Sequence, residues 1–163
     1  MKFTLIFLFI TTFMTTQAQK DTYGFIHIQD SSKNIAPVYR KAGNFSAGLV
    51  SVEKNGKWGF IDADNHEIIA PHYDYARSFQ HGQSIVKQGV FYGVINMKGE
   101  FVIPPRYYDL RPYELEGKHY YISRDSTFFA GIIDKNGDEV LPHKYTYVME
   151  LEGFSSMGSP RLY

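Results

Sequence analysis

The sequence contains no cysteine. Disulfide bonds, thiolate chemistry and cysteine-based zinc sites are therefore excluded. An excess of charge of either sign is also missing, because 17 basic residues balance 17 acidic ones. A chain without net charge lacks the excess of basic residues that attracts nucleic acid, so no nucleic-acid partner is expected. Stability must come from packing and backbone pairing, for which an aromatic content of 17% supplies apolar area.

Long apolar runs are absent except near the N-terminus. Lys2 precedes an apolar stretch from Phe3 to Phe13, and Thr16 and Ala18 then provide small residues. This order is typical of a secretory signal, and the run is shorter than the ~20 residues that a membrane span needs. We predict that residues 1–18 are a signal peptide. The mature protein would then begin near Gln19, lie in the periplasm or outside the cell, and have no membrane span.

The rest of the chain shows an internal repeat and no helical period. Each copy starts with an aromatic or small residue before glycine, and 14 or 15 residues after the glycine an apolar run with proline ends in tyrosine. The starts are Tyr23-Gly24, Trp58-Gly59, Tyr92-Gly93 and Ala130-Gly131, and the later landmarks are Pro37 with Tyr39, Pro71 with Tyr73, Pro105 with Tyr107, and Pro142 with Tyr145. We predict units at 23–57, 58–91, 92–129 and 130–154, within a domain of 19–154, and a tail at 155–163.

Each unit has the pattern of β-strands joined by tight turns. Asn55-Gly56 separates two strand-like runs, which is the strongest short-range signal for a hairpin because both central residues take positive φ. A second turn ends in Gly99 in the third unit and in Gly137 in the fourth, and Asn65 stands at that place in the second unit. Asparagine is the usual substitute for glycine in the left-handed region, so we expect Asn65 to have positive φ.

The prolines limit how the strands pair. Proline has no N–H to donate to a neighbouring strand, so each is expected to end a strand or to mark a sheet edge. A single unit cannot bury its apolar face and must stack on its neighbours. We therefore predict an all-β tandem repeat array of short antiparallel strands and hairpins, stacked like a solenoid, with an incomplete β-propeller as the alternative.

The stretch from Lys57 to Asp62, followed by an apolar run, Pro71 and Tyr73-Asp74, resembles the unit of WG-repeat proteins. The resemblance extends from residue 23 to about residue 154. It is complete only in the second copy, because Tyr23, Tyr92 and Ala130 replace the tryptophan. The resemblance implies a bacterial β-repeat architecture with no general catalytic activity and no common ligand.

Residues with catalytic or metal-binding chemistry do not form a recognisable motif. None of the six histidines is paired at a standard ligand spacing, so we interpret them as surface or hydrogen-bonding residues and expect no metal and no cofactor. Asp62 and Asp134 start turns, where a carboxylate accepts backbone hydrogen bonds. Asp74 and Asp109, beside the landmark tyrosines, are less well explained. No catalytic residue is predicted.

The aromatic residues divide into two sets. The landmark residues at equivalent positions of the units are expected to form core ladders between successive units. Those outside the landmarks are candidates for contact with a partner, namely Tyr75, Tyr108, Tyr113, Tyr120 and Tyr121, with Phe128 and Phe129 beside them.

Three functions remain open from the sequence. The first is an exported, non-enzymatic binding or scaffolding module whose partner is a protein. The second is a module that binds a cell-wall or environmental glycan, which a row of exposed, evenly spaced aromatics would favour. The third is an enzyme, which a deep pocket with facing carboxylates would favour.

Overall fold

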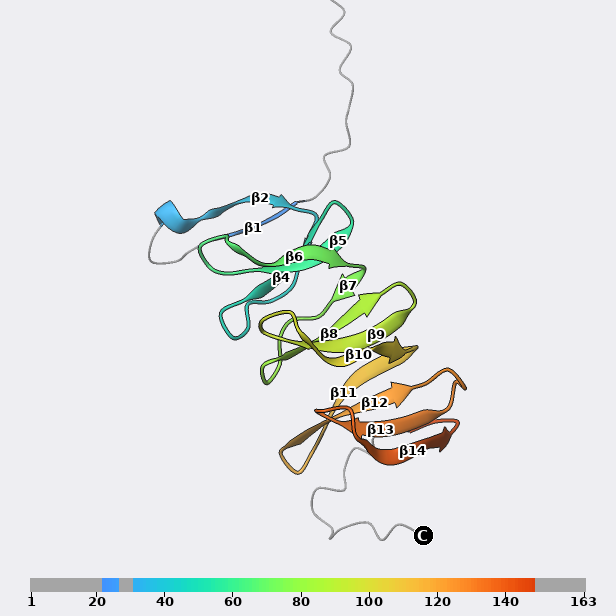
Figure 1. The fold of residues 1–163 in the computed structure, drawn as a ribbon. Coiled ribbons are helices and arrows are strands. Elements are labelled where there is room, and N and C mark those ends of the chain that lie inside the picture. The colour runs from blue at the N-terminus through green and yellow to red at the C-terminus, as the bar shows by residue number, and fades with distance from the viewer. Residues whose placement is uncertain (1–21, 27–30, 149–163) are drawn as a thin grey trace, which may run out of the picture.

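The computed structural model describes residues 22–26 and 31–148, and the predicted signal peptide and tail lie outside them (Figure 1). Within the described residues the only helical element is the short 3-10 turn η1 (Ser31–Lys33). The strands form one two-stranded and three four-stranded sheets, and every pairing is antiparallel. The all-β prediction is confirmed.

The three large sheets share one plan, in which strands follow each other in chain order. The two-stranded sheet pairs β1 (Tyr23–Phe25) with β2 (Ile35–Tyr39). The large sheets contain β3 (Lys41–Ala42), β4 (Val50–Lys54), β5 (Lys57–Ile61) and β6 (Glu67–Tyr73); β7 (Tyr75–Ala76), β8 (Gln83–Gln88), β9 (Phe91–Asn96) and β10 (Phe101–Tyr107); and β11 (Asp109–Leu115), β12 (Lys118–Arg124), β13 (Ala130–Asp134) and β14 (Glu139–Tyr145).

Each large sheet joins the end of one sequence unit to the start of the next. A sheet begins just after a landmark tyrosine, at Lys41, Tyr75 or Asp109, and its third strand carries the landmark glycine of the following unit. The pair β1 and β2 is therefore the half-sheet that the first unit leaves at the end of the array. The large sheets begin at intervals close to the length of a sequence unit, but each begins about half a repeat after the start of a unit.

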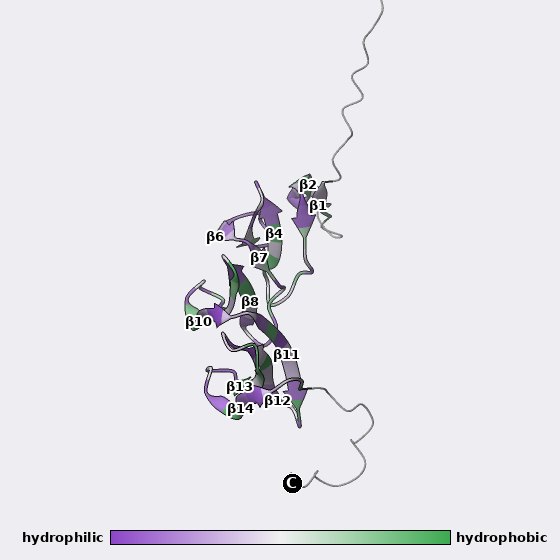
Figure 2. Ribbon diagram, turned by 90° about the vertical axis from the view of Figure 1, so that its right-hand side faces the viewer, coloured by the Kyte–Doolittle hydropathy of each residue, from purple (hydrophilic) through white to green (hydrophobic). Residues whose placement is uncertain are grey.

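The sheets stack in an open column, with β1 and β2 at one end and β14 at the other (Figures 1 and 2). An apolar core fills each space between successive sheets. The three cores contain Ile35, Tyr39, Val50, Val52 and Ile61; Leu49, Phe60, Ile69, Tyr73, Ala76, Phe79, Val86 and Ile95; and Ile85, Val94, Ile103, Tyr107, Leu110, Tyr121 and Ile133. The observed arrangement is the solenoid-like stack.

A bulge at the glycine of each unit explains why glycine and proline recur together. In β5 and β6, Trp58 pairs with Tyr73 and Phe60 pairs with Ile69, so the residues between the pairs are one on β5 and three on β6. The surplus residues of the proline strand arch over the glycine, and a Cβ on Gly59 would lie 2.5 Å from the carbonyl oxygen of Ile69. The same close approach occurs at Gly24, Gly93 and Gly131, at 2.5, 2.6 and 2.7 Å.

The prolines lie inside the edge strands β2, β6, β10 and β14, so the prediction that they mark an edge is confirmed and the prediction that they end a strand is wrong. The bulge is the physical reason. The regular ladder of hydrogen bonds is already interrupted at the bulge, so a residue without an N–H is accommodated there.

The turn predictions are confirmed by the backbone angles. Asn55 and Gly56 have φ values of 55° and 80°, as a two-residue hairpin turn of this type requires. Asn65, Gly99 and Gly137 have φ values of 67°, 83° and 92°. Asn65 has an added role, because the hydroxyl of Tyr39 in the preceding sheet donates a hydrogen bond of 2.6 Å to its side-chain oxygen.

This hydrogen bond changes what a substitution of Asn65 should do. From the sequence alone, Asn65→Gly is expected to be neutral. In the structure it also removes the acceptor of Tyr39, so we expect a loss of about 1 kcal/mol in the free energy of unfolding. Asn65→Val should cost about 2 kcal/mol or more, because a β-branched residue is strained at positive φ. Urea melts measure both changes.

A double-mutant cycle with Tyr39→Phe separates the two causes. If the hydrogen bond is responsible, Asn65→Gly becomes neutral once the Tyr39 hydroxyl is gone, while Asn65→Val stays destabilising. An equal cost of Asn65→Gly in both backgrounds would show that the Tyr39 hydroxyl contributes nothing.

Candidate functional site

The landmark tyrosines belong to the scaffold. Tyr39, Tyr73 and Tyr107 are buried in the three cores, and burial raises the pKa of Tyr39 and Tyr73. Tyr145, on the last strand, is exposed. The aromatic residues before the glycines were also expected to form a ladder in the core, but none of them is fully buried. Trp58 and Tyr92 are half-buried and border the cores, and Tyr23 is exposed.

The recurrent carboxylates also serve the scaffold. Asp62 accepts backbone hydrogen bonds from Asp64 and His66, and these bonds lower its pKa. Asp134 accepts the same kind of bonds from the two backbone N–H groups at residues 136 and 138. Turn capping is confirmed for both.

The two carboxylates that the sequence left unexplained also have partners. Asp74 accepts hydrogen bonds from the Lys57 ammonium at 2.5 Å and the Gly89 N–H at 2.7 Å, and both lower its pKa. It thereby joins the linker after β6 to the first residue of β5 and to the turn before β9. Asp109 pairs with Arg111 at 3.1 Å.

One side of the column carries two groups of contacting aromatic side chains, which together we call the aromatic edge. Its members lie on three successive sheets, beside the turns that precede β5, β9 and β13. These turns are on the right of the column in Figure 1. In one group Tyr75 contacts Trp58 and Tyr92, with ring centroids 6.0 and 6.4 Å apart. In the other, Tyr108 contacts Phe91 and Phe128, with centroids 5.0 and 4.9 Å apart. The aromatic edge comprises Trp58, Tyr75, Tyr92, Phe91, Tyr108 and Phe128.

The aromatics proposed from the sequence as partner contacts fall in three places. Tyr75 and Tyr108 belong to the aromatic edge. Tyr113 and Tyr120 pair across the hairpin of β11 and β12 and are half-buried. Tyr121 is buried, its hydroxyl donates to the side-chain oxygen of Gln83 at 2.8 Å, and burial raises its pKa to about 12. The prediction is therefore wrong for Tyr121, which belongs to the third core.

The third sheet departs from the repeat at its first strand. β11 has seven residues, while the equivalent strands β3 and β7 have two each. The resulting hairpin of β11 and β12 extends on the side opposite the turn between β12 and β13 (Figure 1). Between this hairpin and the loop before β8 lies a hollow of about 130 Å³, lined among others by Arg77, Tyr113 and Tyr120.

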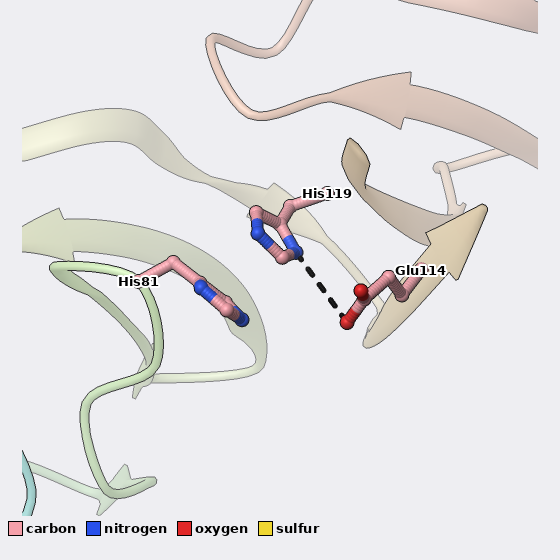
Figure 3. A group of neighbouring side chains, drawn as sticks. All are labelled: His81, Glu114 and His119. Atoms are coloured by element: carbon pink, nitrogen blue, oxygen red, sulfur yellow. Dashed lines mark ion pairs between the residues drawn. The ribbon is translucent and has the colours of Figure 1, made fainter. Parts of the chain in front are cut away.

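Three side chains with metal-binding chemistry meet at this hollow (Figure 3). His81 comes from the loop before β8, and Glu114 and His119 lie directly opposite each other on β11 and β12. The imidazole rings of His81 and His119 are stacked, with centroids 3.3 Å apart and planes inclined by 20°. Nδ1 of His119 lies 3.8 Å from the Glu114 carboxylate, and the potential ligand atoms of all three residues lie within 4.8 Å of one another.

The other described histidines have the hydrogen-bonding roles that the sequence suggested. His66 contacts Asp62, His72 contacts the carbonyl of residue 70, and His143 contacts both Ser123 and Glu139. His27 lies outside the described residues. The pair of His81 and His119 is the exception. The sequence gives no signal for it, because the two residues are 38 positions apart and belong to different repeats.

The stacked sheets, the glycine bulges and the regular turns define the chain as an open β-repeat protein. The family model of the WG containing repeat matches residues 23–58, 58–89, 92–122 and 131–155. The chain belongs to this family. No curated protein and no solved structure matches it.

Proposed function

We propose that this chain is an exported, non-enzymatic binding module, and that its partner is a protein that docks on the aromatic edge. A family of stacked repeats suggests a binding or scaffolding role, since each added sheet extends a surface. The observation that carries the proposal is the aromatic edge itself. Tyr75 and Phe128 are 39% and 59% exposed there although the cores are complete without them. Aromatic residues are enriched among the hot spots of protein interfaces.

The orientation of the rings favours a protein partner over a glycan. Sugar rings stack on flat aromatic faces that are open to solvent. Along the aromatic edge the faces are partly covered, because Tyr75 meets Trp58 and Tyr92 edge to face at 60° and 74°, and Tyr108 stacks on Phe128 at 26°. The ammonium group of Lys87 also lies over the ring of Tyr92, 5.2 Å from its centroid. An uneven row of apolar and charged groups suits a protein surface better than a polysaccharide.

The hollow on the opposite side supports a non-enzymatic role. Glycoside hydrolysis needs two facing carboxyl groups, and Glu114 is the only carboxylate among the residues that line this hollow.

The export part of the proposal rests on the N-terminal sequence. A positive charge, a short apolar segment and small residues before Gln19 have the order of a secretory signal. Among the described residues, no helix is long and apolar enough to cross a membrane.

Capture from the exported fraction of the native cell tests the proposal. We expect the recovered chain to have the mass of a protein that begins near Gln19. We expect the wild-type chain to capture a protein, and Tyr75→Ser combined with Phe128→Ser to lose it, because both side chains would lie at the centre of the contact. Mass spectrometry identifies what each chain captures.

Ile68→Ser is the matched control. Ile68 is an exposed apolar residue of β6, 46% accessible and outside the aromatic edge, so its replacement should leave capture unchanged. Urea midpoints of all variants show that loss of capture is not loss of folding. Capture that survives in the folded edge variant, or binding of polysaccharide in place of protein, would refute the proposed partner. A chain that retains its first residues in the exported fraction would refute the cleaved signal.

A further inference from the structure

His81 has a fixed position at the tip of a tight turn. Gln80 and Gln83 exchange two backbone hydrogen bonds of 2.8 and 2.9 Å, which leaves His81 and Gly82 as the two central residues. Their φ values of 50° and 78° are those of the same hairpin turn type as Asn55 and Gly56. The loop therefore presents the imidazole of His81 on a backbone with few alternative conformations.

Glu114 and His119 are positioned by strand register. They face each other on the hairpin of β11 and β12, and directly opposite residues of antiparallel strands share one face of the sheet. The hairpin is also held against the second sheet, because the Tyr121 hydroxyl donates to Gln83, two residues after His81. The same Gln83 side chain donates to the carbonyl of Lys135 at 3.0 Å. Gln83 thus fixes the loop of His81 relative to the third sheet.

We propose that His81, Glu114 and His119 form a binding site for a zinc ion. Two imidazoles and one carboxylate are a ligand set that zinc uses with solvent in its remaining position. Hard cations such as Mg²⁺ prefer oxygen ligands, so they should not compete at this site. The inference goes beyond the proposed function, because it assigns a ligand to the opposite side of the column.

The distances permit the site once the stacked imidazole rings turn so that their nitrogen lone pairs point to one ion. Bond lengths of about 2.1 Å in a tetrahedral arrangement place two ligand atoms about 3.4 Å apart. Nδ1 of His119 and the Glu114 oxygen are 3.8 Å apart, and no separation in the set exceeds 4.8 Å. His81 and Glu114 are exposed and His119 is half-buried, so their rings and carboxylate are free to turn toward a shared ion.

A zinc ion at this position would join two repeats. His81 belongs to the second large sheet and the other two ligands to the third, so the ion links the loop before β8 to the extended hairpin. An ion that binds only the folded chain raises the free energy of unfolding by an amount that grows with the logarithm of its concentration once that concentration exceeds the dissociation constant. Zinc binding should therefore raise the melting temperature and hold the hairpin at a defined angle to the second sheet.

Calorimetric titration of the tag-free chain with zinc chloride tests the inference. We expect one zinc ion per chain and no saturable binding of magnesium. His81→Asn, His119→Gln and Glu114→Gln should each weaken zinc binding about tenfold or more, since each removes a ligand. Asparagine is chosen at position 81 because it tolerates positive φ.

His66→Gln is the matched control, because His66 is an exposed histidine that contacts a carboxylate, Asp62, in a different turn. It should bind zinc as the wild type does. Urea midpoints without metal show whether each variant is folded. Glu114→Gln is the variant least expected to disturb folding, because glutamine has nearly the same shape as glutamate. Absence of saturable zinc binding by the wild type, or zinc binding that survives in the folded variants, would overturn the site. Neither result bears on the aromatic edge, whose test uses different residues.

Discussion

Replacement of Gly93 by alanine is expected to destabilise the protein by about 3 kcal/mol or more. The added Cβ would lie 2.6 Å from the carbonyl oxygen of Ile103 and 2.8 Å from the nitrogen of Pro105. Both are backbone atoms, so no side-chain rotation relieves the contact and the bulge of β10 must open. Since Val94 and Ile103 lie in the third core, that movement also disturbs packing between sheets. The free energy of unfolding from urea melts measures the effect.

Gly89→Ala is the control for this substitution. Gly89 has a φ of 63° and open space around its Cα, so alanine there meets no atom within 4 Å. Gly89→Ala should lower the free energy of unfolding by only about 1 kcal/mol, because alanine is less stable than glycine at positive φ. Similar costs for the two variants would mean that the close approach at Gly93 does not limit the fold.

Ending the chain at Ala130 should remove most of the stability of the third large sheet. The cut deletes nearly all of β13 and all of β14 and leaves the hairpin of β11 and β12, and an isolated two-stranded hairpin is marginal in water. It also removes Ile133 from the third core and the carbonyl of Lys135 that accepts from Gln83. We expect a loss of about 4 kcal/mol or more, or a transition that is no longer cooperative.

A chain that ends at Phe154 is the matched truncation. It lacks only the predicted tail of 155–163, whose glycine, serine and proline residues carry no strand pattern, so its urea midpoint should equal that of the full chain. A short truncation that unfolds the protein, together with a long truncation that does not, would contradict the repeat boundaries.

Local sequence signals predicted the elements that depend on neighbouring residues. Asn55-Gly56 and the turn at Asn65 follow from backbone sterics, which act over a few residues, and both have the predicted φ. The prolines predicted edge strands correctly. The bulge that brings the glycine and the proline together was not foreseen, because in it three residues of one strand lie opposite one residue of the other.

Features that depend on the stacking of repeats were not predictable from one sequence. A period has no intrinsic starting point, so the pattern could not show that each sheet begins after a landmark tyrosine. Tyr121 and its neighbour Tyr120 look alike in the sequence, yet only Tyr121 points into a core. His81 and His119 become neighbours because one unit has a longer hairpin, a departure from the repeat that spacing rules do not detect.

We propose that the exposed rings of the aromatic edge, Tyr75 and Phe128, bind the partner and do not build the stack. The most direct test is the dissociation constant of the purified partner, measured for the wild type, for Tyr75→Ser with Phe128→Ser, and for Ile68→Ser, with the urea midpoint of each. The account predicts affinity weaker by about a hundredfold or more for the folded edge variant and no change for Ile68→Ser. Unchanged affinity in a folded edge variant would contradict it.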